Sequence, residues 1–168
     1  MPEAWLRGPI EGVDALLQPA AHALVQAGED LDGATVGVGA ENLWIRPNGA
    51  ASLGYHIRHM AGSLDRLLTY ARGAQLDERQ IAFLKREAEP GSPPDELPTL
   101  IAHARKSIDS ALAQLRATRR EELLEPRAVG RQGLPSNVLG LLFHAAEHTT
   151  RHVGQAITTA KIVTADLG

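Results

Sequence analysis

The sequence predicts an all-α protein built as one bundle of four long helices. Apolar residues recur at the 3.6-residue period of an amphipathic helix in four separate stretches. The 168 residues include only two Phe, two Tyr and two Trp, so the core must consist mainly of Leu, Ala, Ile and Val, a mixture that suits helices. No repeat or linker divides the sequence, and residues 1–168 are expected to form a single domain with almost no strand.

Residues 8–32 form the first predicted helix. Its apolar stripe comprises Ile10, Val13, Leu17, Ala20, Ala21 and Leu24. Pro9 occupies a plausible first helical position, whereas Pro19 falls inside the pattern and is expected to kink or divide the helix. His22 lies opposite the stripe and is expected in solvent. The glycine-rich residues 33–49 are predicted to be a loop, in which residues 44–47 pack over the bundle as an extended piece.

The second helix is predicted to begin after Ser52, a suitable N-cap residue, and to end at Gly73. Its stripe comprises Leu53, Ile57, Met60, Leu64, Leu67, Leu68 and Ala71. His56 lies near the edge of this stripe and His59 lies on its flank. The residues expected to face away from it are Arg58, Asp65 and Thr69.

A long connection, residues 73–94, follows the second helix. Residues 78–87 are expected to form a short helix within it, and the Pro-Gly-Ser-Pro-Pro run at 90–94 is a clear break. So long a connection allows the third helix to run parallel to the second, as in bundles with a crossover.

The third helix is predicted over residues 97–119, and His103 lies off its apolar stripe, so this histidine is expected to be exposed. Residues 127–133 are predicted to be a second loop. The last helix is expected over residues 134–161, with Pro135 near its first turn.

The last helix carries three histidines at a spacing of four residues: His144, His148 and His152. Residues spaced in this way lie on one helix face, here at the border of the apolar stripe, where a side chain can point into a bundle and still meet polar groups. Bundles build metal sites from such positions on facing helices. The chain has no cysteine, which excludes disulfides, thiolate ligands and a cysteine nucleophile and leaves histidines as the leading candidate ligands.

Charge and hydropathy exclude other classes of partner. A net charge of −3 gives no basic field for nucleic acid or an anionic membrane. No apolar run approaches the length of a membrane span, and the first residues lack the layout of a signal peptide. We therefore expect a soluble, cytoplasmic protein.

His148 and His152 are one helical turn apart and can supply half of a tetrahedral or octahedral metal site. Such a pair is also common as surface decoration, but His56 and His59 on a second helix favour a site. The run lacks the glutamate of zinc proteases, since His148 is followed by Thr-Thr-Arg, and Glu147 points about 100° away around the helix. No Glu-x-x-His pair is present, so a carboxylate-bridged di-iron centre is not expected.

Taken together, these positions resemble the DinB-like superfamily over almost the whole chain. The residues that carry the resemblance are Trp44, Pro47, Ser52, His59, His148, His152 and Gln155. The resemblance implies a four-helix bundle of up-down-down-up topology, commonly dimeric, with a divalent metal held by three histidines. The implied ligands are His59, His148 and His152, with water in the open positions. Periodicity alone favours His56 over His59, and the offset from Ser52 in the family pattern selects His59.

His56 and His144 are then left for packing, or for hydrogen bonds that orient the ligands. The residue types do not choose among zinc, nickel, iron and copper, because imidazole suits them all.

Three functions stay open. The first is a metal-dependent enzyme of the kind that the family implies, a thiol S-transferase or a hydrolase, acting on a low-molecular-weight thiol or another small molecule. Ser63 and Tyr70 are its possible polar helpers, while Arg151 lies on the far edge of the helix. The second is a non-catalytic, metal-stabilised stress-response protein. The third is a helical dimerisation module with incidental histidines, which would pair as a homodimer through Phe143 and Leu139.

Overall fold

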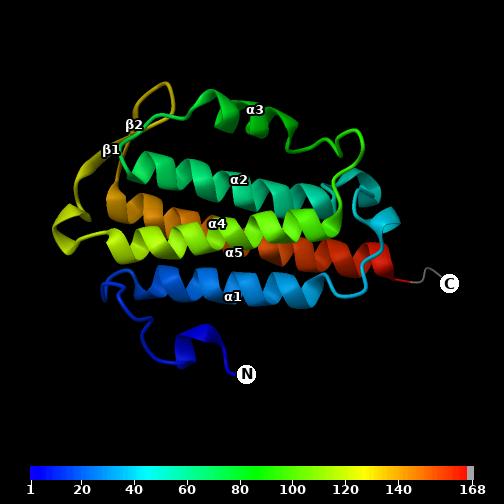
Figure 1. Ribbon diagram of the computed structural model, residues 1–168, viewed down its shortest axis with the longest axis horizontal. Helices are drawn as coiled ribbons and strands as arrows, with labels where there is room; N and C mark the ends of the chain where they lie inside the picture. Colours follow the sequence, from blue (N-terminus) through cyan, green and yellow to red (C-terminus); the bar gives the residue numbers. More distant parts are fainter. Residues whose placement is uncertain (166–168) are drawn as a thin grey trace.

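A computed structural model describes residues 1–165 of the chain. Its long helices are α1 (Gln18–Ala34), α2 (Leu53–Ala71), α4 (Leu97–Ala117) and α5 (Val138–Thr164). A short helix, α3 (Glu78–Arg86), lies on the outside of the bundle next to α2 (Figure 1). The smaller elements are the 3-10 turns η1 (Ala4–Leu6), η2 (Ala40–Asn42), η3 (Pro47–Gly49) and η4 (Arg120–Glu122), and a hairpin of β1 (Pro126–Val129) and β2 (Leu134–Asn137). The predicted helical bundle is confirmed.

Each long helix packs against two others: α2 against α5 and α4, and α1 against the same two. In Figure 1, α1 and α5 run in one direction and α2 and α4 run in the other. The topology is therefore up-down-down-up, as expected, and the parallel neighbours α2 and α4 are joined by a crossover that contains α3. Within the described residues, none of the helices combines the length and the apolar character needed to cross a membrane.

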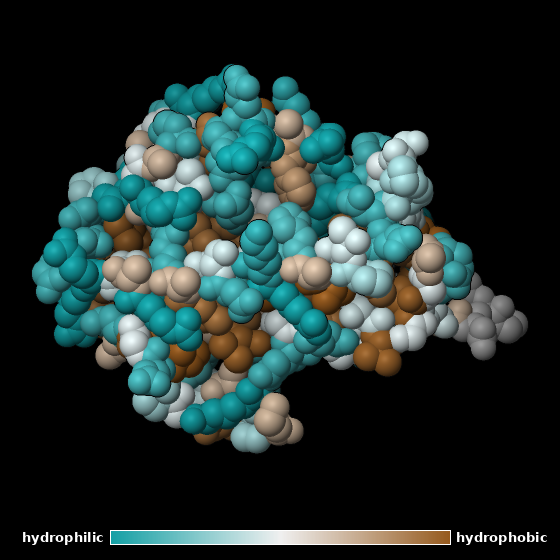
Figure 2. Space-filling model, viewed as in Figure 1, coloured by the Kyte–Doolittle hydropathy of each residue, from teal (hydrophilic) through white to brown (hydrophobic). Residues whose placement is uncertain are grey.

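The core is made mainly of Leu and Ala, with fewer Ile and Val, in agreement with the aliphatic core that the composition predicts. The same view in Figure 2 shows hydrophilic residues over most of the surface around α3, while hydrophobic residues show in the seams between the long helices. Helix α2 is covered on more than one side, because the long helices cover its apolar stripe and α3 lies against another part of it. Arg58 and Thr69, expected to face away from the apolar stripe, are nonetheless buried, whereas Asp65 is exposed.

The first helix begins at Gln18 rather than at residue 8. Pro19 neither kinks nor divides it but lies in its first turn, where the missing N–H leaves no bond unmade. The residues before it form turns held by Gln18, whose side chain accepts from the backbone N–H of Ile10 and donates to the carbonyl of Val13. His22 is half-buried rather than free in solvent, and its Nε2 lies 2.9 Å from the carbonyl oxygen of Gly8.

Residues 44–47 are anchored to the bundle mainly through Trp44, although the extended piece turns into η3 at Pro47. The Trp44 indole donates to the carbonyl of Asp95 and lies against α2 at Gly54, where a Cβ would come within 2.8 Å of the ring. Ser52 caps α2 as predicted, accepting from the backbone N–H of Tyr55.

The region predicted as a loop at 127–133 and a helix start at 134–135 is the hairpin. Strands β1 and β2 pair antiparallel, with Ala128 opposite Pro135. A residue before proline favours extended backbone, and proline is tolerated at the edge of a sheet, so Pro135 belongs to the strand. Helix α5 begins three residues later, where Asn137 caps it by accepting from the backbone N–H of Gly140 at 2.7 Å.

The buried guanidinium of Arg58 fixes the crossover to α2. It donates to the carbonyls of Arg86 and Pro90 at 3.1 and 3.2 Å, to that of Glu89, and to the carboxylate of Asp95 at 2.5 Å. The Trp44 ring lies 4.6 Å from the guanidinium carbon, within the range of a cation–π contact. One side chain thus satisfies backbone acceptors across most of the second half of the crossover.

We expect Arg58→Ala to lower the free energy of unfolding by about 3 kcal/mol, because it leaves several carbonyls and a carboxylate without their donor. Urea titration followed by circular dichroism measures this. Arg79→Ala is the control: the Arg79 side chain is 94% exposed and pairs only with Asp77, so its loss should cost less than about 0.5 kcal/mol. Equal effects of the two substitutions would contradict the role given to Arg58.

Candidate metal centre

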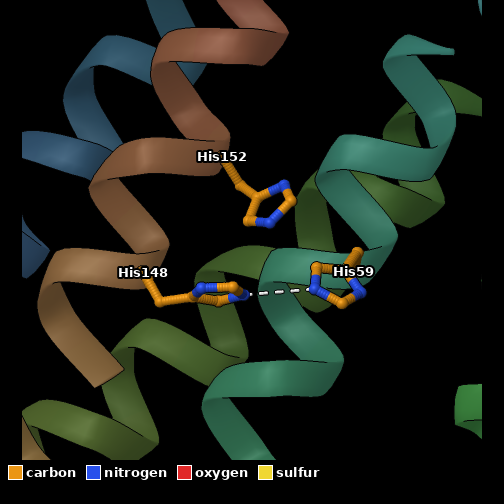
Figure 3. Close-up of side chains that lie close together, drawn as sticks. All are labelled: His59, His148 and His152. Carbon is orange, nitrogen blue, oxygen red and sulfur yellow. Dashed lines mark hydrogen bonds between the residues drawn. The ribbon is translucent and has the colours of Figure 1, made fainter. Parts of the chain in front are cut away.

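Helices α2 and α5 bring His59, His148 and His152 into one cluster. One ligand-capable atom from each residue lies within 4.8 Å of the others. Figure 3 shows the three rings pointing toward a common space between the two helices, with His148 and His152 on α5 and His59 on α2. The sequence analysis named these three residues, and the structure places them together.

The separations suit a shared cation. The Nε2 atoms of His59 and His148 are 3.1 Å apart (Figure 3). Two nitrogens bound to one ion at roughly 2.1 Å would be about 3.0 Å apart at a right angle and about 3.4 Å apart at a tetrahedral angle. The observed distance lies between these values, so the pair could ligate one ion with little movement.

The second nitrogen of each ring differs in its partner. His59 Nδ1 lies 2.6 Å from Glu87 Oε2, and since an ionised carboxylate only accepts, the ring donates. His152 Nδ1 lies 3.2 Å from Nδ1 of the buried His56. His148 Nδ1 is buried with no partner among the described residues. In His59 and His152 the Nδ1 is thus engaged away from the cluster, which leaves Nε2 as the atom that faces it.

Burial favours the uncharged form of three imidazoles at the site, those of His56, His148 and His152. It lowers the pKa of His152 to about 3, with His59 and His148 acting in the same direction. Burial likewise lowers the pKa of His56 and of His148, and in both cases the neighbouring His59 adds to the effect. A metal binds only the neutral imidazole, so these rings are held in the form that can act as a ligand.

Glu87 and Arg66 complete the surroundings of His59. Glu87 is 2% exposed, and its second oxygen accepts from Arg66 at 2.5 Å. Tyr55 stacks on the other side, with its ring 5.2 Å from that of His59. Burial, with the Glu87 charge adding to it, raises the pKa of Tyr55, so its hydroxyl stays protonated and can donate to a ligand near the cluster.

Sequence reasoning missed Glu87, Arg66 and Tyr55. Glu87 lies at the end of a short helix whose place in space the sequence does not give, and Arg66 lies off the apolar stripe. Of these three residues, only Tyr55 could have been found from the sequence. It lies four residues before His59 on the same helix, and residues at this spacing are neighbours.

The other candidates lie outside the cluster. Ser63 donates to the carbonyl of Met60 within its own helix. Tyr70 is eleven residues after His59, about 16 Å along the helix, and cannot reach the histidines. His144 is exposed and contacts Glu147, and its ring lies 5.4 Å from that of His148. Further exposed residues are His103, Arg151 and Gln155, as expected for the first two.

The comparisons with known proteins agree with the architecture. The model of the family described as the DinB superfamily matches residues 23–156. A conserved protein of Enterococcus faecalis has a similar structure, with 17% identity and a TM-score of 0.68 over 88% of this chain and 96% of that chain. A protein of Streptococcus pneumoniae has 14% identity and a TM-score of 0.65 over 89% of this chain and 90% of that one. At such identities the likeness shows the fold alone. No curated protein sequence matches the chain.

The lowered histidine pKa values predict that the metal-free protein loses stability in acid. Below pH 6.5 an unfolded chain takes up a proton on His152 that the folded chain refuses until about pH 3, so the free energy of unfolding falls across this window and levels off above it. His152 alone contributes up to about 1.4 kcal/mol per pH unit. Urea unfolding after chelation, from about pH 4 to about pH 8, measures the slope.

In that experiment His152→Gln should flatten the slope, and His22→Gln, which changes a histidine outside the cluster, should leave it unchanged. An identical slope in the His152 variant and the wild type would show that the cluster does not exclude protons.

Proposed function

Because the chain belongs to the DinB superfamily, we propose that it binds one divalent transition-metal ion through His59, His148 and His152 and acts as a metal-dependent enzyme of the thiol S-transferase or hydrolase type. The observation that carries this proposal is the convergence of three imidazoles from two helices. The donor set is all nitrogen, which suits zinc, nickel, iron and copper. When bound, such an ion lowers the pKa of a coordinated water or thiol and so supplies a nucleophile.

An open ligand position is supported by the exposure of the cluster. A structural zinc site normally has four protein ligands, and within the described residues the cluster offers three. His59 keeps 17% of its side chain exposed, so a small molecule can approach from solvent. The Tyr55 ring stacks on His59, and its hydroxyl, whose pKa burial raises, is a candidate donor to such a molecule.

The charge of the surroundings favours an anionic partner. Three neutral imidazoles leave the charge of a divalent ion uncompensated, and the nearby negative charge of Glu87 is matched by Arg66. A thiolate, a hydroxide or a carboxylate would restore neutrality in a site that is partly removed from water. This argument supports low-molecular-weight thiols or other small anions as the substrate class.

The alternative is a non-catalytic protein in which the ion only joins α2 to α5. It is supported by the position of the ligands on two helices that already pack together. A homodimer remains part of either proposal: Phe143 is 58% exposed and borders, with Pro19 and Ala23, a hollow of about 450 Å³ between α1 and α5 that a second copy could cover.

We expect the purified protein to bind one zinc or nickel ion per chain, measured by elemental analysis after metal supplementation and gel filtration. His59→Ala, His148→Ala and His152→Ala should each weaken binding by more than about 100-fold, beyond the 10–100-fold that changes around a site cost. His22→Ala and His103→Ala are the matched controls and should bind as the wild type does. Full occupancy in both α5 variants would reject the assignment.

We expect a low-molecular-weight thiol to bind the ion directly. Glutathione added to the cobalt-substituted protein should produce a thiolate-to-cobalt charge-transfer band, and S-methylglutathione, which cannot form a thiolate, should not. A cobalt spectrum that glutathione leaves unchanged would indicate a closed site and favour the non-catalytic alternative.

A further inference from the structure

We propose that the crossover between α2 and α4 is a working part of the metal centre, with Glu87 as a positioning residue that fixes His59 and couples metal binding to docking of the crossover. The inference rests on the proposed function, since it concerns the same three-histidine site. It makes the crossover part of the site, although the crossover carries none of the three clustered histidines. It also assigns a role to the buried carboxylate of Glu87, which the sequence pattern does not reveal.

The hydrogen bond to Glu87 selects the tautomer of His59. The carboxylate oxygen accepts at 2.6 Å, so the proton of a neutral His59 ring stays on Nδ1 and the lone pair on Nε2 faces His148. The bond also limits rotation of the ring. Carboxylates that accept from a ligating histidine in this way orient it and make it a stronger ligand.

Glu87 is itself held in place on its other side. Its Oε1 accepts from Arg66, about two helical turns beyond His59 on α2, and both side chains are buried. A buried carboxylate without such a partner would be costly to keep ionised. The carboxylate of Glu87 thus contacts α2 with both oxygens, and the crossover is bound to α2 at two points, His59 and Arg66.

Gly62 on α2 allows Glu87 and Phe83 to approach this helix closely. A Cβ at this position would lie 2.5 Å from Glu87 Oε1 and 2.5 Å from a ring carbon of Phe83, so any larger residue would push the end of α3 outward. Helix α3 has no buried residue of its own. Its docking therefore depends largely on polar contacts: those of Arg58 with the backbone after it, those of Gln80 with Asp65 and Thr69 on α2, and those of Glu87 with α2.

These contacts couple metal binding to docking of the crossover. A cation on Nε2 draws electron density from the His59 ring and makes its Nδ1–H a stronger donor, so metal binding strengthens the bond that holds the crossover. Thermodynamic linkage requires the reverse as well: a docked crossover raises metal affinity by the same factor. If Glu87 were only a buried ion-pair partner for Arg66, metal binding would leave the crossover unchanged.

The test measures zinc affinity and hydrogen exchange on the full chain. We expect Glu87→Gln to weaken zinc binding by about 10–100-fold, because the amide keeps the size of the side chain and loses its charge. In the wild type, zinc should slow amide exchange in residues 78–95, and in Glu87→Gln this effect should be lost. The matched control is Glu89→Gln, an exposed glutamate in the same segment, which should behave as the wild type.

A second pair of variants displaces Glu87 without changing a polar group and decides the question if Glu87→Gln does not fold. Gly62→Ala should lower zinc affinity and abolish zinc-dependent protection of residues 78–95. Gly154→Ala on α5, where a Cβ meets nothing within 4 Å, is its control and should do neither.

The outcomes separate the two proposals. A wild-type chain that binds none of zinc, nickel, iron and copper overturns the proposed function and this inference with it. Zinc binding that is equally tight in the wild type and in a folded Glu87→Gln or Gly62→Ala variant, or zinc binding without protection of residues 78–95, overturns the role of the crossover alone.

Discussion

The packing of α2 against α5 is the constraint on which the site depends. Residues of both helices are fully buried in the shared core, among them Ile57 and Leu64 on α2 and Leu142 and Val153 on α5. A shift of one residue in either helix would turn its side chains by about 100° and separate the histidines. Because close-packed cores resist such shifts, the rings are brought together by apolar packing and need no ion to assemble them.

The sequence predicts the structural features that depend on apolar periodicity. It does not predict the features that depend on polar contacts between distant segments of the chain. Four helices and the two halves of the histidine cluster follow from spacing, and the choice of His59 over His56 follows from the family pattern. Periodicity fails for Arg58, which lies opposite an apolar stripe and is nonetheless buried, since the crossover covers it. Pro19 and Pro135 mark element starts more closely than the apolar pattern does.

The buried arginine and glutamate side chains of the described residues lie between α2 and the crossover. Arg58, Arg66 and Glu87 are all nearly free of solvent contact and all join α2 to the crossover. Buried ion pairs contribute little net stability, because desolvation offsets their attraction, yet they specify one arrangement over others. Here these pairs set the position of the crossover. This segment has few apolar contacts of its own, and it carries Glu87, the hydrogen-bond partner of His59.

The separation of His59 from His148 along the chain, 89 residues, has a consequence for the order of events on the ribosome. When α2, α3 and α4 have been synthesised, His59 and Glu87 can already meet, while the remaining two imidazoles have not yet been made. If the three histidines hold an ion as proposed, that ion can be captured with all three ligands only by a chain whose last helix has already packed against α2. Metal loading would then report that folding is complete.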